Sequence, residues 1–253
     1  MASASYQTAP LLRTKSFVQR WYLTGMAIAM LGVAIAAFTP SLAHPAGRRA
    51  PLSLLDAAHG IVFFVWLLIF LVQCSLVATR HVAWHRRLGL ASIFPLVLMI
   101  PLAWETTVAM MRRGFDLSGD LSIEVGNNIF RDAVFPFCNI LIFSALVSAA
   151  LAYRRRPEIH KRLMLFANIE LMPAPLAHFI GHSPSLSHLT GAIIGVPISI
   201  FVIAAIGRDL LVTRRVHPLT WWLAALRTVS GPLEAGPIGS SAAWQHLAEW
   251  LAR

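Results

Sequence analysis

Six long apolar runs constrain this 253-residue chain more than any other feature of its sequence. They cover residues 21–38, 54–79, 88–107, 133–153, 163–180 and 192–212. A helix rises about 1.5 Å per residue and needs roughly 20 apolar residues to cross the hydrocarbon layer of a bilayer. Because 57% of the chain is hydrophobic and only 13% is charged, a soluble fold is excluded. The sequence predicts an all-α, polytopic transmembrane helical bundle.

A seventh run, 218–233, is marginal because it is short, carries Arg227 and contains Gly231 and Pro232. Beyond it, residues 242–251 would place Trp244, Leu247 and either Trp250 or Leu251 on one helical face, which predicts a short interfacial helix. We therefore expect a cytoplasmic N-terminal segment at 1–20, a transmembrane domain at 21–241 and a C-terminal interfacial helix at 242–253.

Lysine and arginine form short clusters between the apolar runs, which is typical of topology signals and not of a nucleic-acid-binding face. One side of the predicted membrane carries nearly three times as many of them as the other. The positive-inside rule therefore predicts a cytoplasmic N-terminus, with the loop that contains Asp116, Asp120 and Glu124 outside. The expected partner on the cytoplasmic side is a bilayer with anionic headgroups.

The cytoplasmic loops share a pattern. Arg80-x4-His85-Arg86-Arg87-Leu88 in one loop corresponds to Arg155-x4-His160-Lys161-Arg162-Leu163 in the next, and Arg214-Arg215-Val216-His217-Pro218 is a weaker echo. Three hairpins in the same orientation after one leading helix would make seven helices. The repeat thus favours the marginal seventh run.

The loop residues have two interpretations. The simpler one is that they contact lipid headgroups or anions at the cytoplasmic surface; these residues are Arg80, His85, Arg86, Arg155, His160, Lys161 and His217. The alternative is that His81 and the three histidines of this set gather around an anionic ligand or a metal. The spacing leaves both possible.

Histidines near the outer ends of the runs suggest a cofactor site. His59 lies in the second run, His178 in the fifth, and His182 four residues further on. Facing imidazoles could bind haem b, copper or zinc, with His59 and His178 as the expected pair and His182 as a further candidate. The alternative is that these rings bond to neighbouring helices or to interfacial water.

Other polar side chains inside the runs also indicate function, since each is costly there unless it is paired or lines a cavity. They are Gln73, Glu105, Asn139, Asn168 and Glu170. Pro173 and Pro175 follow Glu170, so we expect the fifth helix to be bent or broken beside a polar cavity. Glu170 could relay protons, bind a cation, or be protonated and structural. Arg208 and Asp209 predict an ion pair.

The combination His59-x13-Gln73-x11-His85-Arg86-Arg87-Leu88-Gly89 resembles a group of uncharacterised bacterial multi-pass inner-membrane proteins. The segments His160-Lys161-Arg162-Leu163-Met164 and His217-Pro218 are also similar to that group. This resemblance covers about residues 50–250 and implies a helical bundle in a bacterial cytoplasmic membrane, with no particular activity. A looser likeness to membrane b-type cytochromes depends on histidine placement alone.

Three classes of function follow. The chain could be a haem- or metal-binding electron-transfer component, a proton-coupled transporter or channel-like carrier, or a non-catalytic assembly or structural protein of the membrane. No GxxxxGK, GxGxxG, GxSxG or HExxH motif is present. Their absence argues against familiar hydrolase, kinase or dehydrogenase chemistry and leaves membrane redox chemistry open.

Overall fold

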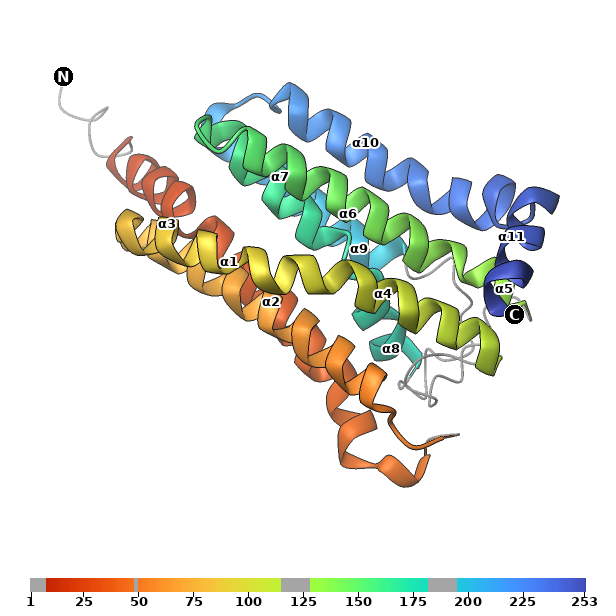
Figure 1. The fold of residues 1–253 in the computed structure, drawn as a ribbon. Helices are drawn as coiled ribbons and strands as arrows, with labels where there is room; N and C mark the ends of the chain where they lie inside the picture. The colour runs from red at the N-terminus through yellow and green to blue at the C-terminus, as the bar shows by residue number, and fades with distance from the viewer. Residues whose placement is uncertain (1–7, 48–49, 115–127, 182–194) are drawn as a thin grey trace, which may run out of the picture.

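The computed structural model describes residues 8–47, 50–114, 128–181 and 195–253, and this part of the chain forms helices and turns without a strand (Figure 1). Six helical segments are long and apolar enough to cross a membrane. They are Ser16–Ala43, Leu54–Ala78, Val82–Arg113, Ile129–Ala152, Pro157–Ile180 and Gly195–Thr213. The all-α multi-pass membrane fold predicted from the sequence is confirmed.

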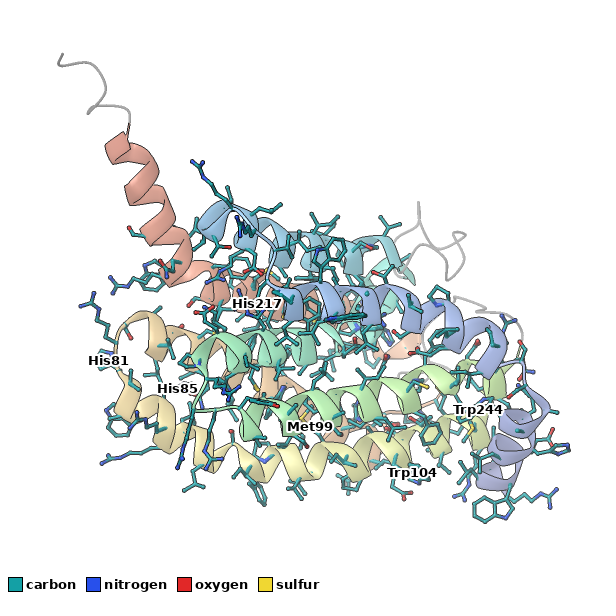
Figure 2. All side chains as sticks on the ribbon, turned by 90° about the horizontal axis from the view of Figure 1, so that it is seen from above. His81, His85, Met99, Trp104, His217 and Trp244 are labelled. Atoms are coloured by element: carbon teal, nitrogen blue, oxygen red, sulfur yellow. The ribbon has the colours of Figure 1, made fainter. Side chains whose placement is uncertain are left out.

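The leading helix α1 runs over Thr8–Ala43 and is followed by the short 3-10 helix η1, Pro45–Gly47. It begins inside the segment that was expected to precede the transmembrane domain. Pro10 does not prevent this, because proline is tolerated in the first turn of a helix. The first turns of α1 project beyond the end of the bundle (Figures 1 and 2).

The first hairpin consists of α2, Leu54–Ala78, followed by α3, Val82–Ala91, and α4, Ile93–Arg113. A capping box starts α2: the Asp56 amide donates to Ser53 Oγ at 3.1 Å, and the Ser53 amide donates back to Asp56 Oδ2 at 3.3 Å. Arg80, with a φ of 66°, turns the chain between α2 and α3.

The second hairpin consists of α5, Ile129–Asp132, α6, Val134–Ala152, α7, Pro157–Ile169, and α8, Pro173–Gly181. The predicted interruption of the fifth apolar run is confirmed, since α7 ends just before Glu170 and α8 begins at Pro173. Pro173 has no amide proton to continue the helical ladder.

The third hairpin joins α9, Gly195–Thr213, to α10, Pro218–Leu233. With 16 residues, α10 is too short to count among the six spans, but the five-residue π-helix η3, Glu234–Ile238, continues it directly. Together they run beside α6 and α7 along the length of the bundle (Figure 1). The structure therefore has one leading helix and three hairpins, as the loop repeat predicted.

The loops after α2, α6 and α9 lie at one end of the bundle, which we call the basic end because residues 80–87, 154–162 and 208–217 carry its arginines and lysines. The core between the helices is apolar and includes Met30, Met99, Phe143 and Phe166, each at most 1% exposed. Large apolar side chains also cover the outside, among them Phe94, Leu141 and Trp222, at 73%, 69% and 75% exposed. A surface of this kind suits contact with lipid.

The C-terminal helix α11, Ala242–Ala252, lies at the opposite end, beside α4 and α5 (Figure 1). Its predicted apolar face is divided. Trp244 turns toward the protein, where its Nε1 donates to the Phe130 carbonyl at 2.8 Å and its ring packs on Phe137. Leu247 and Trp250 point outward, at 45% and 65% exposed. Trp244 and Leu251, the alternative to Trp250 on this face, both pack against the cluster of Val108, Met111 and Phe137, so the expected shared face holds for these two residues and not for Leu247.

Candidate functional site

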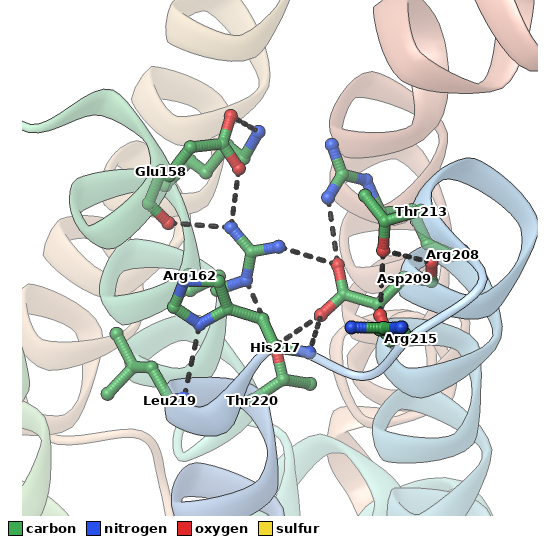
Figure 3. A network of polar contacts seen from close by, with 10 residues as sticks. Glu158, Arg162, Arg208, Asp209, Thr213, Arg215, His217, Leu219 and Thr220 are labelled. Carbon is green, nitrogen blue, oxygen red and sulfur yellow. Dashed lines mark hydrogen bonds and ion pairs between the residues drawn. The ribbon is translucent and has the colours of Figure 1, made fainter.

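Asp209 is the centre of a buried polar network at the basic end (Figure 3). It is 1% exposed, and its Oδ1 accepts hydrogen bonds from Arg162 Nη2 at 2.6 Å and Arg208 Nη1 at 2.9 Å. Its Oδ2 accepts from the Thr220 hydroxyl at 2.6 Å. The predicted Arg208–Asp209 ion pair is confirmed. The partners from α7 and α10 were missed, because nothing in the sequence pairs residues that lie so far apart.

The same carboxylate fixes the start of α10. Asp209 Oδ2 accepts from the His217 amide at 3.2 Å, and His217 Nδ1 in turn accepts from the Leu219 amide at 3.1 Å, which makes His217 the N-cap. Burial, reinforced by the charge of Arg162, lowers the pKa of His217 below its ordinary 6.5. The neutral ring is also the form in which Nδ1 can accept the hydrogen bond from Leu219.

The two loops that share the Arg-x4-His pattern place their histidines at the same helical position, but the basic residues that follow lie in different environments. His85 and His160 are each the fourth residue of the helix that follows the loop, α3 and α7. Arg87 in the first loop is exposed and lies over the Trp84 ring. Its counterpart Arg162 is buried, at 5% exposed. The repeat therefore extends to the backbone position of these residues and not to their contacts.

A second buried polar cluster lies at the break between α7 and α8. Glu170 is 1% exposed, and its Oε2 lies 3.4 Å from Nη1 of Arg227 on α10. The same nitrogen donates to Ser230 Oγ at 2.8 Å. Glu234, at 2% exposed, follows Arg227 by seven residues, and within the described residues neither of its buried carboxylate oxygens accepts a hydrogen bond. The Ser230 hydroxyl donates to the Arg227 carbonyl at 3.4 Å.

The two clusters belong to one line of polar groups. Thr220, Arg227 and Glu234 follow one another at seven-residue intervals, close to two helical turns, so they share one face of α10 and η3. Opposite this face, Arg162 on α7 contacts Thr220, and Glu170, just after the end of α7, contacts Arg227. We call this line the polar seam; its members are Arg162, Glu170, Asp209, Thr220, Arg227, Ser230 and Glu234.

The charges at the middle of the seam do not balance when every group is ionised. Arg227 pairs with Glu170, whereas the buried carboxylate of Glu234 has no hydrogen-bond partner among the described residues. A buried charge without a counter-charge costs several kcal/mol, roughly. A neutral cluster of these three groups therefore has one protonated carboxylate.

Asn168 is not part of the seam. It is fully buried, and its Oδ1 accepts from Trp66 Nε1 at 3.1 Å while its Nδ2 donates to the Met164 carbonyl at 2.9 Å. The Trp66 contact joins α7 to α2, whereas the Met164 contact lies within α7. Of the two polar residues predicted near the middle of the fifth run, Asn168 therefore makes a structural contact and Glu170 is a member of the seam.

The histidines expected to bind a cofactor have different neighbours. The Nδ1 atom of His59 lies 3.2 Å from Thr106 Oγ1 on α4, and its ring stacks on Phe63. The ring of His178 packs on Phe38 of α1, with centroids 4.8 Å apart. His182 lies outside the described residues. In the described ranges no group of three or more His, Cys, Asp or Glu side chains is placed to share a metal ion.

The remaining intramembrane polar residues lie apart from the seam's contacts. Gln73 shares with His59 the face of α2 that turns toward α3 and α4, where its amide packs against Gly89. Asn139 on α6 has a buried Oδ1 without a hydrogen-bond partner among the described residues. Glu105 is exposed on the surface of α4.

The basic-loop residues divide into exposed and engaged groups. Arg80, Arg86 and Arg155 are exposed and free to meet headgroups. His160 is engaged, since its Nδ1 lies 2.8 Å from the Ala150 carbonyl and therefore carries the proton of that hydrogen bond. Lys161, which is half-buried, pairs with Glu158. Figure 2 places His81 and His85 around the α2–α3 turn and His217 at the start of α10.

An ion pair at the opposite end was also missed. Arg113, near the end of α4, donates to Asp56 Oδ2 at 3.0 Å and to Oδ1 at 3.3 Å. The Asp56 side chain is 2% exposed. Because Asp56 also completes the capping box of α2, it both starts that helix and fixes it to α4. Asp and Arg at the ends of adjacent runs are the signal that could have indicated the pair.

Comparison of the chain with protein-family models, with curated proteins and with solved structures finds no match in any of the three.

Proposed function

We propose that this protein is a channel-like proton carrier and that its polar seam is the route of the proton. The observation that supports this most directly is the buried carboxylate of Glu170, 3.4 Å from the Arg227 guanidinium, with a second buried carboxylate, Glu234, seven residues after Arg227. Ionisable groups inside a membrane bundle commonly belong to substrate or proton pathways. The break between α7 and α8 adds backbone groups without helical partners beside Glu170.

The proposed step is the transfer of one proton between the two carboxylates. With the proton on Glu234, the ionised Glu170 offsets the charge of Arg227. With the proton on Glu170, the ionised Glu234 offsets it instead. Both states leave the cluster without net charge, so neither has the cost of an unpaired buried ion. The proton would then leave toward the basic end of the bundle.

We further propose that the basic end faces the cytoplasm of a bacterial cell and that the membrane is the cytoplasmic one. The excess of arginine and lysine at that end supports this orientation. The proton would then enter from the side of Glu234 and leave near Asp209, and the N-terminus would be cytoplasmic.

Electron transfer through haem or a metal remains a prediction from the sequence, as does an assembly role. The side-chain contacts of the histidines and of the seam support these two functions less than they support proton transfer. A bis-histidine haem needs two imidazoles that face one another. His59 bonds to α4 and His178 packs on α1, whereas the seam places three ionisable groups in one buried cluster.

Proton flux into liposomes tests the proposal. The full chain would be reconstituted with a pH-sensitive dye inside and an imposed potassium diffusion potential. Glu170→Gln and Glu234→Gln should each lower the flux at least about tenfold, because an amide of the same shape cannot release a proton. Glu105→Gln is the matched control, since Glu105 is exposed on α4 and outside the seam.

Two results would overturn the proposal. One is a wild-type flux no greater than that of empty liposomes. The other is wild-type flux in both seam variants, with each variant shown to be folded by its elution as a single detergent-solubilised species.

A further inference from the structure

A small cavity lies at the basic end, where α1 meets α7, α9 and α10. Its volume is about 40 Å³, whereas one buried water needs roughly 10–15 Å³. Its polar lining includes Gln19, Tyr22, Lys161 and Arg208. It therefore has room for more than one or two waters, and its walls come from both the leading helix and the repeated hairpins.

The charge around the cavity is unbalanced. Three cations border it, Lys161, Arg162 and Arg208, whereas Asp209 and the adjoining Glu158 supply two negative charges. One positive charge is left over. At the end of a membrane bundle, such a charge is most favourable beside an anion.

The hydrogen-bond donors of these groups are only partly used. All three guanidinium nitrogens of Arg162 have acceptors, namely Thr220, Glu158 and Asp209. The Tyr22 hydroxyl, in contrast, is buried and has no hydrogen-bond partner among the described residues.

Lys161 and Arg208 each have one acceptor on a side chain, Glu158 and Asp209 respectively. An ammonium carries three donors and a guanidinium five, so both can donate further. Tyr22, Lys161 and Arg208 thus present spare donors to the same cavity.

We propose that this cavity binds a phosphate group with a single negative charge, as in the phosphodiester of an anionic lipid headgroup or in free phosphate. Lysine and arginine are the residues that bind phosphate oxygens most strongly, and the Tyr22 hydroxyl adds a neutral donor. One negative charge would balance the one positive charge left over. The cavity lies where headgroups meet the bundle, and Gln19 on its wall is exposed. This site does not depend on proton transfer along the seam.

Native mass spectrometry of the full chain in mild detergent tests the proposal, with phosphatidylglycerol as the anionic probe and phosphatidylcholine as the zwitterionic one. The wild type should retain one phosphatidylglycerol in preference to phosphatidylcholine. Lys161→Gln should weaken retention about tenfold, and Tyr22→Phe several-fold. Arg86→Gln is the matched control, because Arg86 holds the position of Lys161 in the first loop but is exposed and does not line the cavity. Any headgroup that Arg86 meets lies outside the cavity, so this variant should retain the one tightly held phosphatidylglycerol as the wild type does.

Added inorganic phosphate separates the two sources. If it displaces the lipid at millimolar concentration, free phosphate is a ligand of the site; if it does not, the site is for lipid. A site that binds neither phosphatidylglycerol nor phosphate, or equal retention of both lipids, would overturn the proposal. So would a loss in Arg86→Gln as large as that in Lys161→Gln. If the Lys161→Gln variant does not fold, the Tyr22→Phe variant provides the test instead. Binding of phosphatidylglycerol by Tyr22→Phe as strong as that of the wild type would then overturn the proposal.

Discussion

Arg162 and Asp209 form a buried ion pair between α7 and α9, with Nη2 and Oδ1 2.6 Å apart and side chains only 6% and 2% exposed. Asp209 also accepts from Thr220 on α10, so three helices meet at one carboxylate. A buried pair of this kind adds modestly to stability while it is intact, but the loss of one partner leaves an uncompensated charge.

Asp209→Ala should therefore lower the free energy of unfolding by about 3–5 kcal/mol, because Arg162 and Arg208 then lose their buried counter-ion. Denaturant unfolding in mild detergent, followed by far-ultraviolet circular dichroism, measures this change. Arg87→Leu is the control, since Arg87 occupies the place of Arg162 in the first loop but is exposed, and it should cost at most about 0.5 kcal/mol. Equal losses would contradict a special role for the Asp209 network.

The helices could be predicted from the sequence because the bilayer imposes a length and a composition on each of them. The last run was placed at 218–233, the bounds that α10 has. The break beside Glu170 followed from Pro173. The start of α1 was placed too late, because hydropathy marks the apolar part of a helix and not where its hydrogen bonds begin.

The seam could be predicted only in part, because it depends on which helix faces which. Glu170 was singled out by its depth, but Arg227 was taken as a weakness of the last run and not as its partner. The seven-residue interval from Thr220 to Arg227 to Glu234 is the signal that was present. Asn168 shows the converse. It lies as deep in the sequence run as Glu170, but its side-chain oxygen accepts a hydrogen bond from Trp66 and so serves to join two helices.

Trp66→Phe should lower the free energy of unfolding by about 1–3 kcal/mol, since the buried Asn168 Oδ1 loses the indole donor while the ring volume is largely kept. The same unfolding measurement applies. Trp104→Phe is a suitable comparison, because Trp104 is 45% exposed and packs edge-on against Phe137. A loss in Trp104→Phe as great as in Trp66→Phe would assign the effect to ring size and not to the hydrogen bond.

The stability of the bundle should fall as the pH is lowered from about 6.5, the ordinary pKa of histidine. Burial lowers the pKa of His217 in the folded protein, so below that pH the unfolded chain binds a proton that the folded chain does not. Protonation would also remove the Nδ1 acceptor that caps α10. Melting temperatures of wild type and His217→Asn at pH 7.5 and 5.5 measure this contribution.

Asparagine can cap the helix without titrating, so His217→Asn should lose less stability between the two pH values than the wild type does. An identical pH response in both proteins would show that other groups cause the acid sensitivity.

Whether α10 and η3 together cross the membrane determines the side on which the C-terminus lies. If the leading helix and all three hairpins cross, the two termini lie on opposite sides of the membrane, and the excess of arginine and lysine at the basic end makes the N-terminal side cytoplasmic. A periplasm-dependent phosphatase fused after Arg253 should then be active, and the same enzyme fused before Met1 should be inactive. Activity in neither fusion would mean that α10 returns without crossing, because α10 is the 16-residue helix that only the π-helical extension lengthens. Activity in the N-terminal fusion alone would reverse the orientation, and with it the proposed direction of proton movement from Glu234 toward Asp209.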